Sequence, residues 1–345
     1  MLTKMHLKNF KGFRDTEIPE FRKVNLILGG QNVGKTSLLE AVVFVAGDAY
    51  SNNQPSSRSN LPSIFRPSEG HDASRFWRGL IGTKQKPLNI KVEASFGVDS
   101  YQMSGYLRND DAPYRFGEKT NDQGDDLDSW EVDYSRFKEF ETAPWFYGSS
   151  KLTPSIPQSG DIPEPFSAFP KKASEQVELY GRLVTGRKKY AITDLLKQIE
   201  PRLESIEAVA PDGENRVYVE LAGHPVLLPL SQLGHGFTRL FELYSGLAVT
   251  DSKLALIDEI ENGIHYSALP TVFQGIRELA ESNGVQSIVT THSLEAIKAA
   301  CEVFEDNPED FQLIRLERTK DDNIRAVAIN DENLKTVMAS GWEIR

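Results

Sequence analysis

Two short segments of the chain carry residues whose types and spacing suit chemistry on phosphate groups. Residues 29–36 spell Gly-x-x-x-x-Gly-Lys-Thr, and an acidic pair, Asp258 and Glu259, follows an apolar run much further along the chain. A loop of this pattern turns successive backbone N–H groups towards phosphate oxygens when it joins a buried strand to a helix. Within it, Lys35 would reach the β- and γ-phosphates and the Thr36 hydroxyl would ligate Mg²⁺. The first segment therefore predicts a site for a nucleoside triphosphate with Mg²⁺.

The flanks of this loop fit the same prediction. Val24–Leu28 is an apolar run typical of a buried strand, and Leu38, Leu39, Val42 and Val43 follow the loop with helical spacing. The chain has no Asn-Lys-x-Asp motif of the kind that reads guanine, so a GTPase is disfavoured and ATP is the expected nucleotide. The candidate nucleotide-binding residues are Gly29, Gly30, Gln31, Asn32, Val33, Gly34, Lys35, Thr36 and Ser37.

The acidic pair stands directly after the run Leu-Ala-Leu-Ile, which is expected to form a buried strand. Two adjacent carboxylates at such a strand end cost desolvation energy, so a functional role explains them better than a structural one. Asp258 is expected to hold the metal ion with Thr36, while Glu259 orients or deprotonates the attacking water. Lys35 and Glu259 are therefore candidate catalytic residues. We interpret the nearby Glu261 as a solvated charge at the start of a helix.

Strand-like and helix-like segments alternate in the last third of the chain, which predicts an α/β fold with a parallel sheet and flanking helices. We expect strands at 254–257 and 286–290, helices from Ser231, over 266–280 and from Ser293, a hairpin over 311–316 and 324–329, and a short helix from Glu332. Residues 88–107 alternate with period two and predict antiparallel strands. Residues 173–207 are expected to be helical.

The chain divides into three parts by composition. Residues 1–48 and 216–345 are expected to form the nucleotide-binding core, interrupted by a β-rich insertion with mobile loops at 49–147 and by a helical lobe at 148–215. The stretch from Asp48 to about Gly82 is rich in Ser, Asn, Pro and Gly, which is why we expect mobile loops in the insertion.

Charge and cysteine content narrow the class of protein. The 345 residues include 39 Lys and Arg against 50 Asp and Glu, a net charge of −11, so a polybasic nucleic-acid binder is excluded and any DNA contact needs a local patch. The single cysteine, Cys301, allows no intramolecular disulfide and fits a reducing compartment. No signal-like segment and no long apolar run occurs, so we expect a cytoplasmic protein without membrane contact.

Further segments, taken in order, resemble the ABC-type ATPases. Leu230–Gly236, LSQLGHG, is similar to their signature segment, while MHLKNFKGFRD, IDEIENGIHYSALP and VTTHS look like the other motifs in the form shared by OLD (overcoming lysogenization defect)-like, or AAA_15–AAA_21, proteins and by RecF- and SMC-type heads. The resemblance covers both ends of the chain well and 49–143 poorly. It implies a P-loop NTPase of ABC type, with a mixed central sheet, flanking helices, an antiparallel β subdomain and an inserted helical lobe.

The resemblance also implies a dimer that holds ATP between the phosphate-binding loop of one subunit and the signature segment of the other. The residues acting in trans would be Ser231, Gly234 and Gly236, and His292 would be the γ-phosphate sensor and a third catalytic residue. His265 would pack near the dimer face. Hydrolysis in such a switch is expected to be slow.

Some parts of the family pattern are not matched. The glutamine loop has no clear counterpart, and Gln102 reads as an ordinary strand residue. Asp321 and Asp322 read as a solvated turn, so we expect no Toprim nuclease domain of the kind that full-length OLD proteins carry. No heptad run long enough for a coiled coil of SMC or Rad50 type occurs. The chain looks like the ATPase half of a two-gene system.

Three functions remain open at this stage. The leading hypothesis is an OLD-like ATPase that dimerises around ATP and Mg²⁺ and controls a separately encoded effector, such as a Toprim-like nuclease, in anti-phage defence. The second is a RecF- or SMC-like head that clamps DNA under ATP control, and the third, which LSQLGHG disfavours, is a transporter subunit. A DNA patch could consist of Arg182, Arg187, Lys188 and Lys189, with Arg75 and Arg78, although an ordinary solvated helix face is the simpler interpretation.

Overall fold

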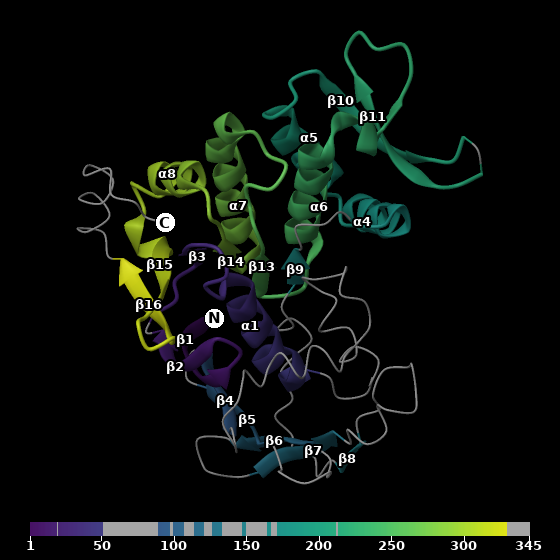
Figure 1. Ribbon diagram of the computed structural model, residues 1–345. Helices are drawn as coiled ribbons and strands as arrows, with labels where there is room; N and C mark the ends of the chain where they lie inside the picture. The colour runs from purple at the N-terminus through teal and green to yellow at the C-terminus, as the bar shows by residue number, and fades with distance from the viewer. Residues whose placement is uncertain are drawn as a thin grey trace.

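A six-stranded sheet forms the middle of the protein (Figure 1). The computed structural model describes residues 1–18, 20–50, 89–96, 99–106, 114–120, 126–132, 147–149, 164–166, 171–211 and 213–329. The sheet has the order β16-β15-β3-β14-β13-β9 and contains β3 (Val24–Leu28), β9 (Glu164–Phe166), β13 (Leu254–Ile257), β14 (Gln286–Thr290), β15 (Phe311–Arg318) and β16 (Ile324–Ile329). Neighbours from β9 to β15 run parallel and only β16 is antiparallel, which confirms the expected mixed sheet.

Helices cover both faces of this sheet. They are α1 (Lys35–Tyr50) on one face, and α6 (His235–Val249), α7 (Leu269–Asn283) and α8 (Leu294–Val303) on the other. Side chains of β3 alternate between the two layers: Leu26 and Leu28 belong to the core under α6 to α8, while Ile27 belongs to the core under α1. An apolar run buried on both faces is what a central parallel strand requires.

A seven-stranded antiparallel sheet lies beyond α1 (Figure 1). Its order is β2-β1-β4-β5-β6-β7-β8, and its strands are β1 (Leu2–Phe10), β2 (Phe13–Ile18), β4 (Asn89–Phe96), β5 (Asp99–Tyr106), β6 (Tyr114–Thr120), β7 (Asp126–Val132) and β8 (Tyr147–Ser149). The antiparallel strands expected over 88–107 are confirmed as β4 and β5, and Gln102 pairs with Glu93 within them. The N-terminal hairpin and the strands of the insertion thus build one sheet.

The lobe beside α6 mixes helices with strands. It contains α4 (Ala173–Thr185) and α5 (Lys189–Lys197) and a small sheet of β10 (Leu203–Val209), β11 (Arg216–Leu221) and β12 (Leu228–Pro229). The helical prediction for 173–207 is therefore wrong at its end, because Leu203 and Ile206 pair with β11 although their spacing suits a helix. The range 148–215 also supplies β9 to the central sheet.

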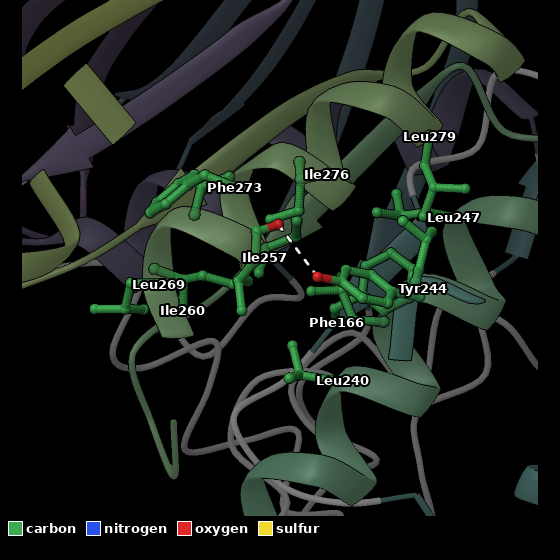
Figure 2. Packing of buried hydrophobic residues seen from close by; sticks show 14 of the residues in the cluster. Phe166, Leu240, Tyr244, Leu247, Ile257, Ile260, Leu269, Phe273, Ile276 and Leu279 are labelled. Atoms are coloured by element: carbon green, nitrogen blue, oxygen red, sulfur yellow. Dashed lines mark hydrogen bonds between the residues drawn. The ribbon is translucent and has the colours of Figure 1, made fainter. Parts of the chain in front are cut away.

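Two glycines allow α6, α7 and β9 to approach closely. A Cβ at Gly275 of α7 would lie 2.7 Å from the Tyr244 hydroxyl, and one at Gly246 of α6 would lie 2.3 Å from the Phe166 ring. Tyr244 is fully buried and its hydroxyl oxygen lies 3.4 Å from the carbonyl oxygen of Val272, to which it donates. Figure 2 shows this cluster, with Phe166 and Leu247 labelled beside the tyrosine. The glycines thus fix α6 against the sheet that carries the candidate site.

Some sequence predictions fall outside the described residues. They are the loops from about residue 51 to 82 with Arg75 and Arg78, and the short helix from Glu332. Among the residues that the structure describes, no helix is both long enough and apolar enough to cross a membrane.

Candidate functional site

The loop between β3 and α1 adopts a conformation that its glycines make accessible. Gly29 has φ 151° and Gly34 has φ 90°, and Asn32 also lies in the left-handed region at φ 58°. A Cβ on Gly29 would lie 2.6 Å from both the Leu316 carbonyl oxygen and a Val33 methyl carbon. Both glycines are therefore required by the shape of the loop, as the Gly-x-x-x-x-Gly-Lys-Thr pattern predicts.

Lys35 folds back onto the loop that precedes it. Its Nζ donates to the carbonyl oxygens of Gly29 at 2.9 Å and Gly30 at 2.8 Å. Burial lowers the pKa of Lys35. The negative charges of Glu261, Asp258 and Glu259 raise this pKa, but burial has the larger effect. A bound anion would favour the charged ammonium and could take over the hydrogen bonds now made to the two carbonyls. The lysine is thus placed to exchange loop oxygens for phosphate oxygens.

Asp258 lies at the end of β13 and meets Thr36 from the start of α1. The Thr36 Oγ1 atom is 3.1 Å from Asp258 Oδ2, and Thr290 Oγ1 donates to Asp258 Oδ1 at 2.6 Å. Burial raises the pKa of Asp258, opposed by these two hydroxyl hydrogen bonds and by the charges of Arg239 and Lys35. A cation beside this carboxylate would favour its charged form.

These oxygen atoms suit magnesium. A hydroxyl and a carboxylate are hard ligands, and Mg²⁺ commonly binds one or two protein groups and completes its shell with water and substrate phosphates. The described residues contain no cluster of three or more His, Cys, Asp or Glu that would form a metal cage by itself. The donor set of Thr36 and Asp258 therefore fits a metal ion that arrives with a nucleotide.

The backbone of Glu259 has an unusual conformation and is fixed by a hydrogen bond. It has φ 48°, a left-handed conformation that is strained for a glutamate, and its N–H donates to Thr290 Oγ1 at 2.8 Å. Its side chain lines the same cleft as the phosphate-binding loop. A strained residue that lines a cleft beside Thr36 and Asp258, the donor set that suits Mg²⁺, is suited to act on a substrate.

Glu261 corrects one sequence interpretation. It is not a solvated charge at a helix start, because its side chain is only 12% exposed and binds the segment after β14. Its carboxylate accepts hydrogen bonds from the His292 backbone N–H at 2.8 Å and from Thr291 Oγ1 at 2.8 Å, and lies 2.9 Å from His292 Nδ1. Glu261 thus fixes the orientation of the His292 ring, leaving Nε2 for a ligand.

Arg239 is a site residue that sequence reasoning missed. It lies on α6, is 4% exposed, and its guanidinium donates to the carbonyl oxygens of Glu259 at 2.6 Å and Asn262 at 2.9 Å, and to that of Asp258. The sequence signal was a charged residue on a mostly apolar helix, and Glu242 on the same helix gives the same signal. Arg239 thus holds the backbone that carries the acidic pair.

Substituting Arg239 tests this positioning role. Arg239→Lys keeps the charge but cannot reach three carbonyls with one compact ammonium, so we expect about a tenfold lower kcat with the KM for ATP unchanged. Arg239→Met leaves the carbonyls without their donor and should lower the free energy of unfolding by about 3 kcal/mol. The matched control is Arg277→Lys on α7, whose guanidinium also binds a backbone carbonyl but outside the site. Equal kcat values for Arg239→Lys and the wild type would refute the role.

The candidate site is an open cleft of about 410 Å³. It brings together loop residues 31–37 with Asp258, Glu259 and His292 and adds residues that were not predicted, whereas the predicted Gly29 and Gly30 do not line it. The lining consists of Gly12, Gln31, Asn32, Val33, Gly34, Lys35, Thr36, Ser37, Asp258, Glu259, His292, Arg318 and Ile324. Residues from five separate parts of the chain thus meet around the phosphate-binding loop.

The signature segment lies outside this cleft. Leu230–Leu233 forms a 3₁₀ turn, and Gly234, with φ 89°, separates it from α6. The helix expected from Ser231 therefore starts later than predicted, at His235. Ser231 and Gly234 are exposed, whereas a Cβ on Gly236 would lie 2.0 Å from the Gly263 carbonyl oxygen. Gly236 therefore allows close packing within the chain, whereas Ser231 and Gly234 lie on the protein surface.

The basic cluster of the lobe mostly serves internal contacts. Arg182 donates to the Val249 carbonyl oxygen at 2.6 Å, Lys188 to that of Ala248 at 2.7 Å, and Lys189 pairs with Glu207 at 2.6 Å. Cations on the last carbonyls of α6 cap that helix and complement its dipole. Three of the four basic side chains are thus explained by the fold rather than by DNA.

The parallel sheet, the glycine-shaped loop and the acidic pair at its edge define a P-loop nucleoside triphosphatase. Residues 24–298 match the family described as "AAA domain, putative AbiEii toxin, Type IV TA system", and the chain belongs to this family. A Helicobacter pylori protein named "ATP/GTP phosphatase" is 23% identical over 338 residues, covering 86% of this chain and 87% of the relative. Both findings support nucleoside triphosphatase activity.

Solved structures of SMC heads share the fold. An SMC head bound to the C-winged helix domain of ScpA has a TM-score of 0.58 at 16% identity, covering 97% of this chain and 99% of that chain. An SMC head with an extended coiled coil, bound to the C-terminal domain of ScpA from Pyrococcus furiosus, has a TM-score of 0.53 at 13% identity, covering 98% of each chain. The fold is therefore that of SMC-type ATPase heads.

Proposed function

We propose that this protein is an OLD-like ATPase that binds ATP with Mg²⁺, dimerises around two nucleotides and hydrolyses them slowly. The observation that carries the proposal is the single cleft that joins the loop residues Lys35 and Thr36 to Asp258, Glu259 and His292. A triphosphate lying along this loop would have a cation, a metal ligand pair, a carboxylate and an imidazole around its γ-phosphate.

The chain's own residues would divide the reaction as follows. Lys35 would leave the carbonyl oxygens of Gly29 and Gly30 and bind phosphate oxygens. Thr36 and Asp258 would hold Mg²⁺, which would supply positive charge to the phosphates. Glu259 accepts a proton from the attacking water, in the position that Arg239 and Thr290 give it. His292, oriented by Glu261, donates to the γ-phosphate.

Dimerisation is proposed from the position of the signature segment. Ser231 and Gly234 are exposed and lie outside the cleft of their own chain, although the resemblance assigns them to a nucleotide. A second copy of the chain would bring its Ser231 and Gly234 to the nucleotide, so each site would be completed by the partner subunit. Hydrolysis would remove the γ-phosphate that joins the two subunits and would open the dimer.

A partner protein is the further component of the proposed switch. The family description names a putative toxin of a toxin–antitoxin system, and the similar SMC heads were solved with a partner domain bound. Both facts support a partner that senses the ATP state, which we propose to be a separately encoded Toprim-like nuclease in anti-phage defence. Co-expression with the product of the neighbouring gene, purified with and without ATP, tests this.

The proposed dimer is tested by Ser231→Arg. The wild type is expected to double its mass with ATP and Mg²⁺ in light scattering, under conditions where hydrolysis is slow. Ser231→Arg should bind ATP as tightly as the wild type but remain monomeric, because the larger side chain blocks the partner's nucleotide. Ser282→Arg is the control, since this exposed serine lies at the far end of α7. A Ser231→Arg protein that still dimerises with ATP would contradict the trans role.

A further inference from the structure

Arg318 is a lining residue of the cleft that the proposed chemistry does not use. The order of the central sheet places it on one side of β3, since β15 and β16 lie there, whereas β14 and β13 lie on the other side. Asp258, Glu259 and His292 follow β13 and β14, whereas Lys35 and Thr36 follow β3 itself. A triphosphate on the loop with its γ-phosphate towards Asp258, Glu259 and His292 would therefore place its nucleoside on the side of Arg318.

The wall on this side has little polar character besides the arginine. It consists of Gly12, Ile324 and Arg318, and a Cβ on Gly12 would lie 2.7 Å from the Ile324 Cδ1 atom. No Phe, Tyr or Trp is among the residues lining the described cleft. Phe13, which packs against the loop at Gly34, is fully buried and offers no ring face to a ligand. A purine entering here would meet the arginine as its one planar neighbour.

The guanidinium is held at its edges. One terminal nitrogen donates to the Asn32 carbonyl oxygen at 3.1 Å and the other pairs with Asp322, whose second oxygen accepts from Arg14 at 3.1 Å. These bonds lie in the plane of the guanidinium, so the flat face is what remains for a ligand. The side chain is 46% exposed and faces the cleft from that fixed position.

The turn that carries Asp322 is itself fixed. The Asn323 side chain accepts hydrogen bonds from the Arg14 and Ile324 backbone N–H groups, both at 2.9 Å, and donates to the Asp15 carbonyl oxygen at 2.9 Å. The turn between β15 and β16 is thereby tied to β2. The arginine plane is consequently preorganised before any ligand arrives, which reduces the entropy lost on binding.

We propose that Arg318 binds the base of the nucleotide by stacking its guanidinium plane on the purine. The inference rests on the proposed function, because it assumes that the triphosphate occupies the loop. Guanidinium groups stack on aromatic faces through cation–π attraction, whereas a lysine ammonium offers no plane. Stacking does not depend on the donor pattern of the base, so the site would accept adenine and guanine alike.

The experiment compares ATP, GTP and inorganic tripolyphosphate by calorimetry at constant Mg²⁺. Arg318→Ala is expected to weaken ATP and GTP binding about tenfold and to leave tripolyphosphate binding unchanged, because tripolyphosphate has no base. Arg318→Lys should lose most of the same affinity, since it keeps the charge without the plane. The matched control is Arg325→Ala, an exposed arginine of the same hairpin that pairs with Glu317 and does not line the cleft.

Three results would overturn the inference. They are an equal loss of tripolyphosphate affinity in Arg318→Ala, wild-type ATP affinity in Arg318→Lys, and no change in Arg318→Ala. A wild-type protein that binds neither ATP nor tripolyphosphate would instead refute the proposed function, so the two failures differ. Melting temperatures equal to that of Arg325→Ala establish that the variants fold.

Discussion

Replacing Lys35 by alanine is expected to abolish ATP binding at concentrations that saturate the wild type. The ammonium would make two charge-assisted hydrogen bonds to phosphate oxygens, each contributing about 2 kcal/mol, so the Kd should rise about a thousandfold. The substitution should spare the fold, because among the described residues Lys35 donates to Gly29 and Gly30 of its own loop and to no other element. Titration calorimetry with ATP and Mg²⁺ measures the effect.

Lys23→Ala provides the matched control for this experiment. Lys23 directly precedes β3, whereas Lys35 follows it, and its Nζ lies 3.4 Å from Asp310 outside the cleft. Its replacement should leave ATP affinity at the wild-type value. ATP bound to Lys35→Ala with wild-type affinity would mean that the loop does not hold the triphosphate, and the proposed function would be lost with it.

Exchanging Glu259 for glutamine should separate binding from hydrolysis. The amide cannot accept a proton from water, so phosphate release is expected to fall about a hundredfold or more. ATP should bind normally and persist, so the variant should remain an ATP-bound dimer after the wild type has hydrolysed its ATP and returned to the monomer. Phosphate release and light scattering on the same sample measure both effects.

The control for Glu259 is Glu305→Gln, which neutralises an exposed carboxylate after α8. It should hydrolyse ATP at the wild-type rate and return to the monomer. If Glu259→Gln also hydrolyses ATP at that rate, another group accepts the proton and the assignment of the base is wrong. Loss of ATP binding in Glu259→Gln would assign this carboxylate to nucleotide binding instead.

Much of the core fold followed from local patterns. The buried run Val24–Leu28, the glycine-containing loop and the spaced apolar residues after it predicted β3 and α1, and β13, β14, β15 and β16 lie where their residues alternate or run apolar. Local patterns failed at 203–209, where Leu203 and Ile206 suit a helix but pair as a strand with β11. Whether such a segment forms a helix or a strand depends on the strand available to pair with it, here β11, which a local pattern does not include.

The candidate site was predictable where a motif carries its own geometry. The loop residues, Asp258 and Glu259 were predicted from their motifs and His292 from the family resemblance, and the structure gathers all but Gly29 and Gly30 in one cleft. Glu261 and Arg239 were not identified, because their roles depend on contacts with His292 and with the carbonyls of 258–262 that no local pattern encodes. For Arg239 the available signal was its charge on a mostly apolar helix, which Glu242 shares.

The helix α6 links the signature segment to the acidic pair, which are separate motifs in the sequence. The helix starts directly after the exposed residues Ser231 and Gly234. About one turn further along, the Arg239 guanidinium donates a hydrogen bond to the Glu259 carbonyl oxygen. If the proposed partner contacts the N-terminus of α6, a tilt of this helix would also shift the backbone that carries Glu259 in the same subunit. In a dimer, ATP bound at one site would then change the position of Glu259 at the other site, and the two ATP molecules would be hydrolysed cooperatively.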